Sequence, residues 1–224
     1  MKKSQFTRMV DRLEAEYAAW DAPAKRFEAA YRRTPFTILV SVMLSFRTKD
    51  EVTLEAGKRL FALADTPETM AALTEERIAE AIYPVGFYRK KAQTIRQMSR
   101  YLLEHCGGEV PRNEAELLKI KGVGPKAAHI VLETAFGEKT VAVDTHVHRI
   151  LNLWGFLATA TPEESFNELK RRLSPEEQAG LNKLLVSFGQ VICRPAKPLC
   201  TECPVADECP AFTPDSPGSS RRRV

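Results

Sequence analysis

Apolar residues recur at helical spacing along almost the whole sequence, and strict alternation of polar and apolar residues is nearly absent. Residues 4–20 show the spacing of an amphipathic helix, and Thr34 and Pro35 open a segment that is apolar on every side, which predicts a buried helix. Further helices are predicted at about 51–63, 88–105, 162–173 and 176–191, and one begins at Pro125. Only residues 140–143 suggest an extended piece. The sequence therefore predicts an all-α fold.

The predicted helix at 88–105 has two distinct faces. Its buried stripe is expected to comprise Ala92, Ile95, Met98 and Leu102. Its remaining surface carries Arg89, Lys90, Lys91, Arg96 and Arg100. Charges on such a face are usually solvated, so we expect a solvated surface and keep direct contact with a partner as the alternative.

Size and composition set the broad class. A chain of 224 residues is one large domain or two small ones, and a net charge of +4 permits a polyanionic partner without establishing one. No apolar run approaches the roughly 20 residues of a membrane span, and the first ten residues lack the apolar core of a secretory signal. We therefore expect a reducing, cytoplasmic compartment and no membrane association. Disulfides are rare there, so the crowding of four of the five cysteines into 193–209 indicates metal binding.

The stretch 117–149 combines three features that chemistry on a phosphate-bearing sugar would need. Gly122, Val123 and Gly124 form a turn between two predicted helices, and glycine lets a main chain approach a phosphate closely. The helix after the turn adds N–H groups and the positive end of its dipole, and Pro125 suits its first position. Such a hairpin positions a nucleic-acid strand without reading bases. A plain helix–helix corner is the alternative interpretation.

Lys126 and Asp144 flank the helix that follows this turn. A lysine beside a phosphate site is most often a counter-charge, but an unprotonated amine can attack a sugar C1′ and form a Schiff base. Apolar neighbours in the sequence, Ala127, Ala128 and Val131 among them, are expected to desolvate this amine. Asp144 has the position of a helix N-cap, and capping does not exclude a catalytic role.

Four cysteines form the array C-x6-C-x2-C-x5-C, with Cys193, Cys200, Cys203 and Cys209 at its positions. Four thiolates in so short a stretch can close on one centre. The uneven spacing suits either zinc or an iron–sulfur cluster, and spacing alone does not decide between them. With four thiolate ligands the centre would be structural or electron-carrying rather than a Lewis acid.

In these motifs the sequence resembles the endonuclease III family of DNA-repair glycosylases, within the helix-hairpin-helix superfamily. The resemblance rests on GVGPK at 122–126, AVDTHVHR at 142–149 and the cysteine array, in that order and separation. It extends over about residues 30–210 through LVSVMLSFRTKDEVT at 39–53, GFYRKKA at 86–92 and GEVP at 108–111.

The resemblance implies a two-domain helix-hairpin-helix glycosylase with a C-terminal 4Fe-4S cluster on the four cysteines. Residues 28–138 would form a six-helix barrel, residues 1–27 with 139–212 a cluster domain, and 213–224 a disordered tail. The implied enzyme is a nucleoid-associated monomer that flips oxidised pyrimidines out of duplex DNA, removes them, and cuts 3′ to the abasic site by β-elimination. Lys126 would be the nucleophile and Asp144 the catalytic carboxylate. The residues expected to contact DNA are Gly122, Val123, Gly124, Arg47, Phe87, His146 and Arg149.

Three positions depart from the common family pattern. Arg47 stands where the family commonly has a Gln that fills the gap left by the flipped base, and Phe87 stands at a wedge position where Leu is common. Arginine prefers guanine acceptors and phenylalanine can stack on a base, so an altered opposite-base or lesion preference is expected. Lys121, where Pro is usual, is expected to add a phosphate contact.

Two other functions share part of this pattern. The adenine-mismatch branch of the superfamily shares cluster and hairpin but lacks the nucleophilic lysine and carries a further C-terminal domain, whereas Lys126 is present here and about 15 residues follow Cys209. A non-catalytic iron–sulfur DNA-binding or redox module would not need to keep both Lys126 and Asp144.

Overall fold

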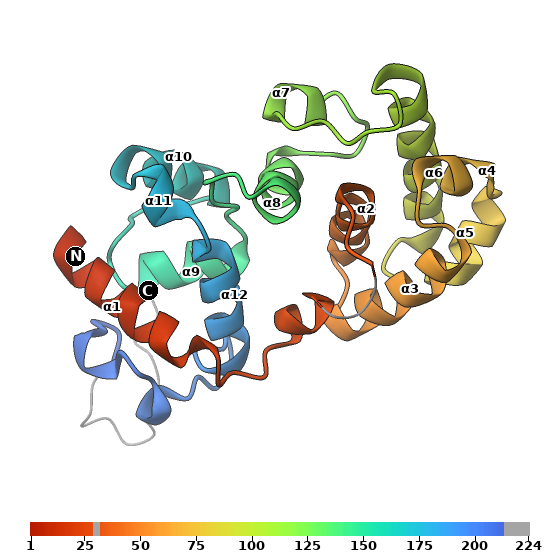
Figure 1. Cartoon of the computed structure of the whole chain (residues 1–224). Helices are drawn as coiled ribbons and strands as arrows, with labels where there is room; N and C mark the ends of the chain where they lie inside the picture. Colours follow the sequence, from red (N-terminus) through yellow and green to blue (C-terminus); the bar gives the residue numbers. More distant parts are fainter. Residues whose placement is uncertain (29–31, 213–224) are drawn as a thin grey trace. The chain divides into compact units, whose positions relative to one another are not determined.

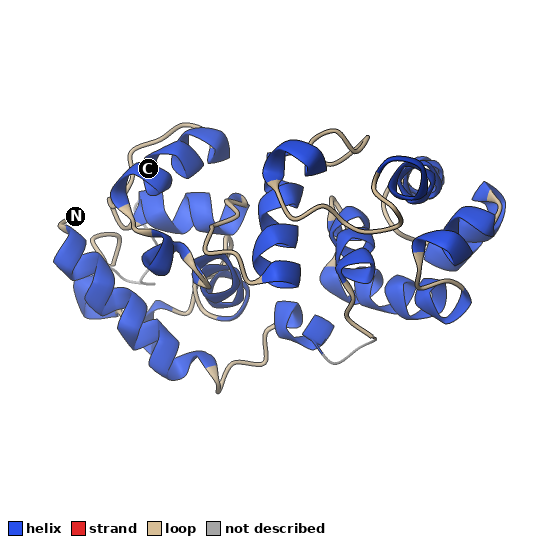
Figure 2. Ribbon diagram, turned by 45° about the horizontal axis from the view of Figure 1, so that its top comes forward, coloured by secondary structure: helices blue, strands red, loops and turns tan. Residues whose placement is uncertain are grey.

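The computed structural model describes residues 1–28 and 32–212, and every regular element in these ranges is a helix (Figures 1 and 2). The predicted all-α fold is therefore confirmed, while the tail expected to be disordered, 213–224, lies outside the described residues. Two compact units make up the chain. We call Arg26–Thr140 the central unit, and Met1–Lys25 together with the chain from Val141 onward the terminal unit.

The central unit is built around α2, which begins after the capping residue Thr34 and has no polar face. Its helices are α2 (Pro35–Ser45), α3 (Asp50–Leu63), α4 (Pro67–Ala72), α5 (Glu75–Ile82), α6 (Tyr88–His105), α7 (Glu114–Leu117) and α8 (Pro125–Phe136). Helix α2 packs against α3, α6 and α8, while α4 and α5 cover α6. The stripe predicted for the helix at 88–105 is confirmed, because α6 buries Ala92, Ile95, Met98 and Leu102.

The terminal unit joins the first helix of the chain to the last ones. It consists of α1 (Lys3–Tyr17), α9 (Thr145–Leu153), α10 (Pro162–Arg172), α11 (Pro175–Gln178), α12 (Leu181–Val191) and the short helices η2 (Cys200–Glu202) and η3 (Ala206–Glu208). A further short helix, η1 (Pro23–Glu28), follows α1. Helix α12 packs against both α1 and α9. Trp154 and Phe188 are fully buried at the centre of this core, and Phe6 stacks on Phe156 with ring centroids 4.0 Å apart.

Two predicted elements differ from the structure. The predicted helix at 176–191 is two helices, because Gly180 takes a left-handed conformation with φ of 76° between α11 and α12. Residues 140–143 have no regular secondary structure and form no strand; Val141 and Val143 are buried in the core of the terminal unit instead. An extended segment needs a neighbouring strand to form a sheet, and the described residues contain none.

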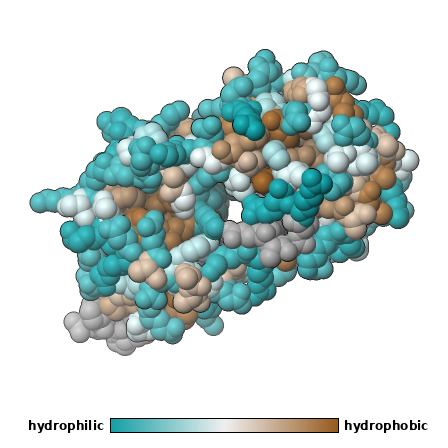
Figure 3. Space-filling model, viewed as in Figure 1, coloured by the Kyte–Doolittle hydropathy of each residue, from teal (hydrophilic) through white to brown (hydrophobic). Residues whose placement is uncertain are grey.

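The surface is mixed in character. Much of the face in Figure 3 is hydrophilic, with smaller apolar patches between the polar residues. In residues 1–28 and 32–212, no helix combines the length and apolar character that crossing a membrane requires.

Candidate active site and cysteine loop

The predicted hairpin is present between α7 and α8. Gly122 has a φ of 90°, and a Cβ there would lie 2.8 Å from Thr94 Cγ2 and 3.1 Å from Met43 Cε, so only glycine fits. Val123 is buried in the core and anchors the turn. Gly124 caps α8 without any side-chain hydrogen bond, and a Cβ there would meet nothing within 4 Å. The helix therefore presents its first N–H groups at a main chain that an anion can approach.

Lys126 lies in the first turn of α8, directly behind this hairpin, and its side chain is exposed. Its Nζ is 5.6 Å from the centroid of the Phe46 ring. The expectation that Ala127, Ala128 and Val131 desolvate the amine is wrong, because these side chains face the buried core. Neighbours along a helix point in different directions, about 100° apart per residue, so adjacency in sequence did not place them around the amine.

Asp144 is the N-cap of α9 in the terminal unit, as predicted. Its Oδ1 accepts hydrogen bonds from the backbone N–H groups of His146 and Val147, both at 2.9 Å. The structure gives Oδ2 no hydrogen bond among the described residues. One carboxylate oxygen thus caps the helix, which leaves the other for a different task.

His146 and Arg149, both predicted to contact DNA, lie against α12 and the segment after it. His146 packs on Gly189 so closely that a Cβ at that glycine would lie within contact distance of the imidazole ring. Arg149 Nη2 donates to the carbonyl oxygen of Cys193 at 2.7 Å, and Nη1 lies 3.8 Å from Cys193 Sγ. Arg149 therefore ties α9 to the first cysteine of the array, and contact of either side chain with DNA stays a prediction.

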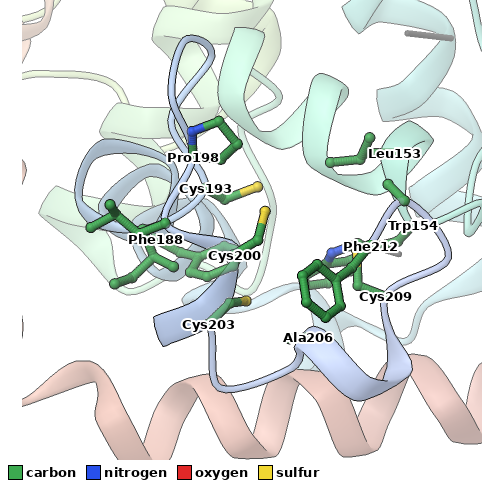
Figure 4. A pocket seen from close by; sticks show the side chains of 13 residues that line it. Leu153, Trp154, Phe188, Cys193, Pro198, Cys200, Cys203, Ala206, Cys209 and Phe212 are labelled. Atoms are coloured by element: carbon green, nitrogen blue, oxygen red, sulfur yellow. The ribbon is translucent and has the colours of Figure 1, made fainter. Parts of the chain in front are cut away.

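The four cysteines of the array line one pocket, which Figure 4 shows with the sulfur atoms of Cys193, Cys200 and Cys203 directed into it. All four are free of disulfides, and the walls include the apolar side chains of Trp154 and Phe188. No group of three or more His, Cys, Asp or Glu in residues 1–28 and 32–212 is arranged as a site for a metal ion. Burial raises the pKa of Cys203 to about 12 and also raises the pKa of Cys209. Cysteines bind a metal centre as thiolates, so ligation here would release the protons of these thiols.

Helix α1 supports the far end of this cysteine loop. Arg8 pairs with Glu208 at 2.8 Å and Arg12 with Asp207 at 2.9 Å, and these acidic residues belong to or adjoin η3, immediately before Cys209. Ion pairs as exposed as these contribute little to stability. The first helix belongs to the same compact unit as the array because Phe6, Met9 and Leu13 are buried in its core, and the ion pairs add contacts next to the last cysteine.

Arg47 and Phe87 come together in the central unit. Both have a left-handed backbone, with φ of 55° and 58°, which costs about 1–3 kcal/mol for residues other than glycine. The Arg47 guanidinium lies over the Phe87 ring at 4.8 Å from its centroid. Phe87 is 59% exposed. The two departures from the family pattern thus form one exposed pair, held in a strained backbone.

The sequence interpretation placed Lys91 on a solvated face, and this is wrong. Lys91 is half-buried and donates to the carbonyl oxygens of Leu44 and Phe46 at the end of α2. Burial lowers the pKa of Lys91 to about 8. One signal could have found it: α2 has neither a basic residue in its last turn nor a glycine after it, so its last carbonyls need a donor from elsewhere.

Comparisons with known proteins show the family to which this chain belongs. A family model described as "HhH-GPD superfamily base excision DNA repair protein" matches residues 40–175. Endonuclease III of Thermotoga maritima is 43% identical over 201 residues, a match that covers 89% of this chain and 94% of the relative. The chain belongs to the endonuclease III family.

Solved structures of endonuclease III have the same fold. A non-covalent endonuclease III–DNA complex matches with a TM-score of 0.84 at 31% identity, covering 94% of this chain and 96% of that one. A trapped covalent endonuclease III–DNA intermediate, an estranged-adenine complex, matches with a TM-score of 0.80 at 32% identity and the same coverage. The HhH-GPD family model, matched to residues 40–175 of this chain, spans the hairpin, Lys126 and Asp144, whereas the four cysteines lie beyond its last matched residue.

Proposed function

We propose that this chain is a base-excision repair enzyme, a DNA N-glycosylase and abasic-site lyase that removes oxidised pyrimidines from duplex DNA. The observation that carries the proposal is an exposed lysine in the first helical turn behind a Gly-x-Gly hairpin, in a chain of the endonuclease III family. A covalent DNA intermediate of an endonuclease III has been trapped, which requires a protein nucleophile in that relative.

Lys126 is the proposed nucleophile. Its neutral amine attacks C1′ as the C1′–N bond to the base breaks, and the base leaves with that electron pair and takes up a proton. Opening of the C1′–O4′ bond then gives the imine. Loss of a C2′ proton expels the 3′ phosphate oxygen with the C3′–O electron pair, which is β-elimination. Water finally hydrolyses the imine and frees the lysine.

Asp144 is the proposed proton acceptor and electrostatic partner. Its Oδ1 is held by two backbone N–H groups, so the carboxylate has a defined orientation before substrate arrives. It would take the proton from the Lys126 ammonium and stabilise the cationic sugar as the base departs. A positioned carboxylate of this kind typically contributes about 10²–10⁴ in rate.

The hairpin is proposed to bind the DNA backbone. Gly122, Val123 and Gly124 would offer main-chain N–H groups to a phosphate, aided by the N-terminus of α8. His146 and Arg149 are proposed to contact the duplex from the terminal unit. We further propose that the barrel domain spans 28–138, that the cluster domain comprises 1–27 with 139–212, and that the enzyme acts as a monomer in the cytoplasm, on nucleoid DNA.

The cysteine loop is proposed to hold a 4Fe-4S cluster. Cys193, Cys200, Cys203 and Cys209 line one pocket with apolar walls, and thiolates in such surroundings suit iron–sulfur ligation. When bound, the cluster would fasten the loop and could carry one electron. Arg149 would hold the Cys193 end of the loop, and Arg8 and Arg12 the Cys209 end.

Arg47 and Phe87 are proposed to fill the space that the flipped base leaves. The guanidinium can donate to the orphaned partner base, most strongly to the O6 and N7 acceptors of guanine, and the ring can stack on a neighbouring base. The proposed enzyme therefore works faster opposite guanine than opposite adenine.

Incubation with a duplex containing thymine glycol tests the proposed function. The wild type is expected to release the base and cut 3′ to the site. Lys126→Gln should bind the duplex without cutting it. Lys121→Gln is the matched control, because it removes an exposed lysine from the other side of the same hairpin and should still cut. DNA binding by the wild type without release of the base would instead indicate a non-catalytic DNA-binding module. Release of adenine from a mismatch would indicate the adenine-mismatch branch of the superfamily.

A further inference from the structure

Beneath Arg47 and Phe87 lies a network of polar contacts centred on Lys91. Its ammonium donates to the carbonyl oxygens of Leu44 at 2.7 Å and Phe46 at 2.6 Å, and to Thr48 Oγ1 at 3.2 Å. These acceptors belong to the end of α2 and the loop after it, whereas Lys91 belongs to α6. A cation at a helix C-terminus is favoured both by the unpaired carbonyls and by the helix dipole. Lys91 therefore holds the end of α2 against α6.

The turn before α6 joins the same network. Gly86 donates its backbone N–H to Thr48 Oγ1 at 3.1 Å. A Cβ at Gly86 would lie 2.6 Å from the carbonyl oxygen of Arg47, so the two backbone segments are in direct contact. The loop after α2 and the turn before α6 are consequently held together through Thr48 and Lys91.

Each of these two segments presents one exposed side chain from a left-handed residue. Arg47 does so from the loop, and Phe87 from the turn. A left-handed backbone in such residues persists only where surrounding contacts hold it. In the loop around Arg47, three hydrogen bonds from Lys91 stabilise this backbone conformation.

We propose that Lys91 is a positioning residue that keeps the Arg47–Phe87 pair arranged for entry into the duplex, an inference that rests on the proposed function. The ammonium is half-buried and donates its hydrogen bonds to the protein segments that carry the pair, so it acts through Arg47 and Phe87. Without it, the carbonyl oxygen of Leu44 loses its side-chain donor, that of Phe46 keeps only the 3.3 Å hydrogen bond from Thr48 Oγ1, and the loop relaxes. Arg47 and Phe87 must then be ordered when DNA binds and the base flips, which makes both steps less favourable.

Lys91→Met in the full chain tests this role. Base release from a thymine-glycol duplex under single-turnover conditions is expected to fall about tenfold, since the gap-filling pair is no longer preorganised. Cleavage of a preformed abasic site in single-stranded DNA, which has no opposite base, should stay within about twofold of wild type. Lys90→Met removes the same charge from the exposed neighbour on α6 and should leave both rates unchanged.

A double variant checks that Lys91 works through the pair. Adding Lys91→Met to Phe87→Ala should lower the rate of base release from the duplex by less than about twofold further. The effects of two substitutions are not additive when one residue acts through the other. Equal losses on duplex and single-stranded substrates, an additive double variant, or the same loss in Lys90→Met would each overturn the inference. If Lys91→Met does not fold, Thr48→Val interrupts the same network. Its rates on the duplex and single-stranded substrates then test the inference in the same way.

Hydrogen exchange at the Gly86 amide reports on the network without any need for activity. Exchange is expected to be about tenfold faster in Lys91→Met and unchanged in Lys90→Met. Unchanged exchange in Lys91→Met would overturn the inference even in an active enzyme. A wild type that releases no base, together with faster Gly86 exchange in Lys91→Met, would refute the proposed function and leave the network intact.

Discussion

Replacing Asp144 by asparagine is expected to lower strand cleavage by at least about 100-fold while helix α9 stays intact. Both backbone N–H groups that Asp144 caps, those of His146 and Val147, donate to Oδ1 alone. An asparagine keeps an oxygen at that place and loses only the charge and the second oxygen. Asparagine is also about as good an N-cap as aspartate. The substitution therefore separates the capping task from the proposed proton transfer.

The expected magnitudes differ between asparagine and alanine. Asp144→Ala removes the acceptor of both hydrogen bonds, and loss of an N-cap costs about 1 kcal/mol. That energy corresponds to roughly fivefold faster exchange of the His146 and Val147 amides through local opening. Asp144→Asn should change this exchange by less than about twofold. Both variants should lose at least about 100-fold in cleavage, the lower end of what a positioned proton acceptor contributes.

Amide exchange and single-turnover cleavage of an abasic duplex measure the two effects separately. Thr161→Ala is the matched control, because Thr161 caps α10 through one hydrogen bond from the Glu164 amide. It should speed exchange in the first turn of α10 and leave cleavage unchanged. Wild-type cleavage by Asp144→Asn would refute the proposed proton transfer. Exchange as fast in Asp144→Asn as in Asp144→Ala would refute the account of the cap.

Three further outcomes are expected. Gly122→Ala should destabilise the chain by about 1–3 kcal/mol in urea unfolding, because its Cβ meets two side chains at a positive φ. Gly124→Ala, which has open space around it, should leave stability unchanged and weaken DNA binding, because its Cβ would stand where the phosphate approaches the main chain. Arg47→Gln should reduce the ratio of base release opposite guanine to that opposite adenine by about tenfold, the value of one good bidentate contact, and equal ratios before and after the change would contradict the gap-filling role. Cys203→Ser should abolish the visible absorption and the bound iron of the purified protein and lower its melting temperature, whereas Cys106→Ser, at the end of α6, should change none of these.

Local signals in the sequence predicted several helices closely. Thr34 and Pro35 mark the start of α2, and the apolar stripe of residues 88–105 matches α6. Capping chemistry and helical periodicity act within a few residues, so they can be read without tertiary structure. The helix break at Gly180 was harder to predict from the sequence. A glycine within a helical pattern can be tolerated or can break the helix, and tertiary packing determines which.

The candidate site was predictable in its residue types and less so in its surroundings. The hairpin and the cap at Asp144 follow from glycine conformation and N-cap chemistry, which are local. The exposure of Lys126 and the burial of Lys91 depend on which helices pack around them. A sequence pattern shows that a lysine lies off the apolar stripe, but it does not show that the open end of α2 lies next to it.

Borohydride trapping tests the central claim, that Lys126 is the amine nucleophile, most directly. Reduction during reaction with a thymine-glycol duplex should convert the Schiff base into a stable protein–DNA adduct, and peptide mass mapping should place the sugar remnant on Lys126. At saturating protein, where the expected phosphate contact of Lys121 no longer limits binding, Lys126→Gln should give no adduct while Lys121→Gln gives one at near wild-type yield. An adduct of undiminished yield in Lys126→Gln, or a remnant mapped to another residue, would contradict the account.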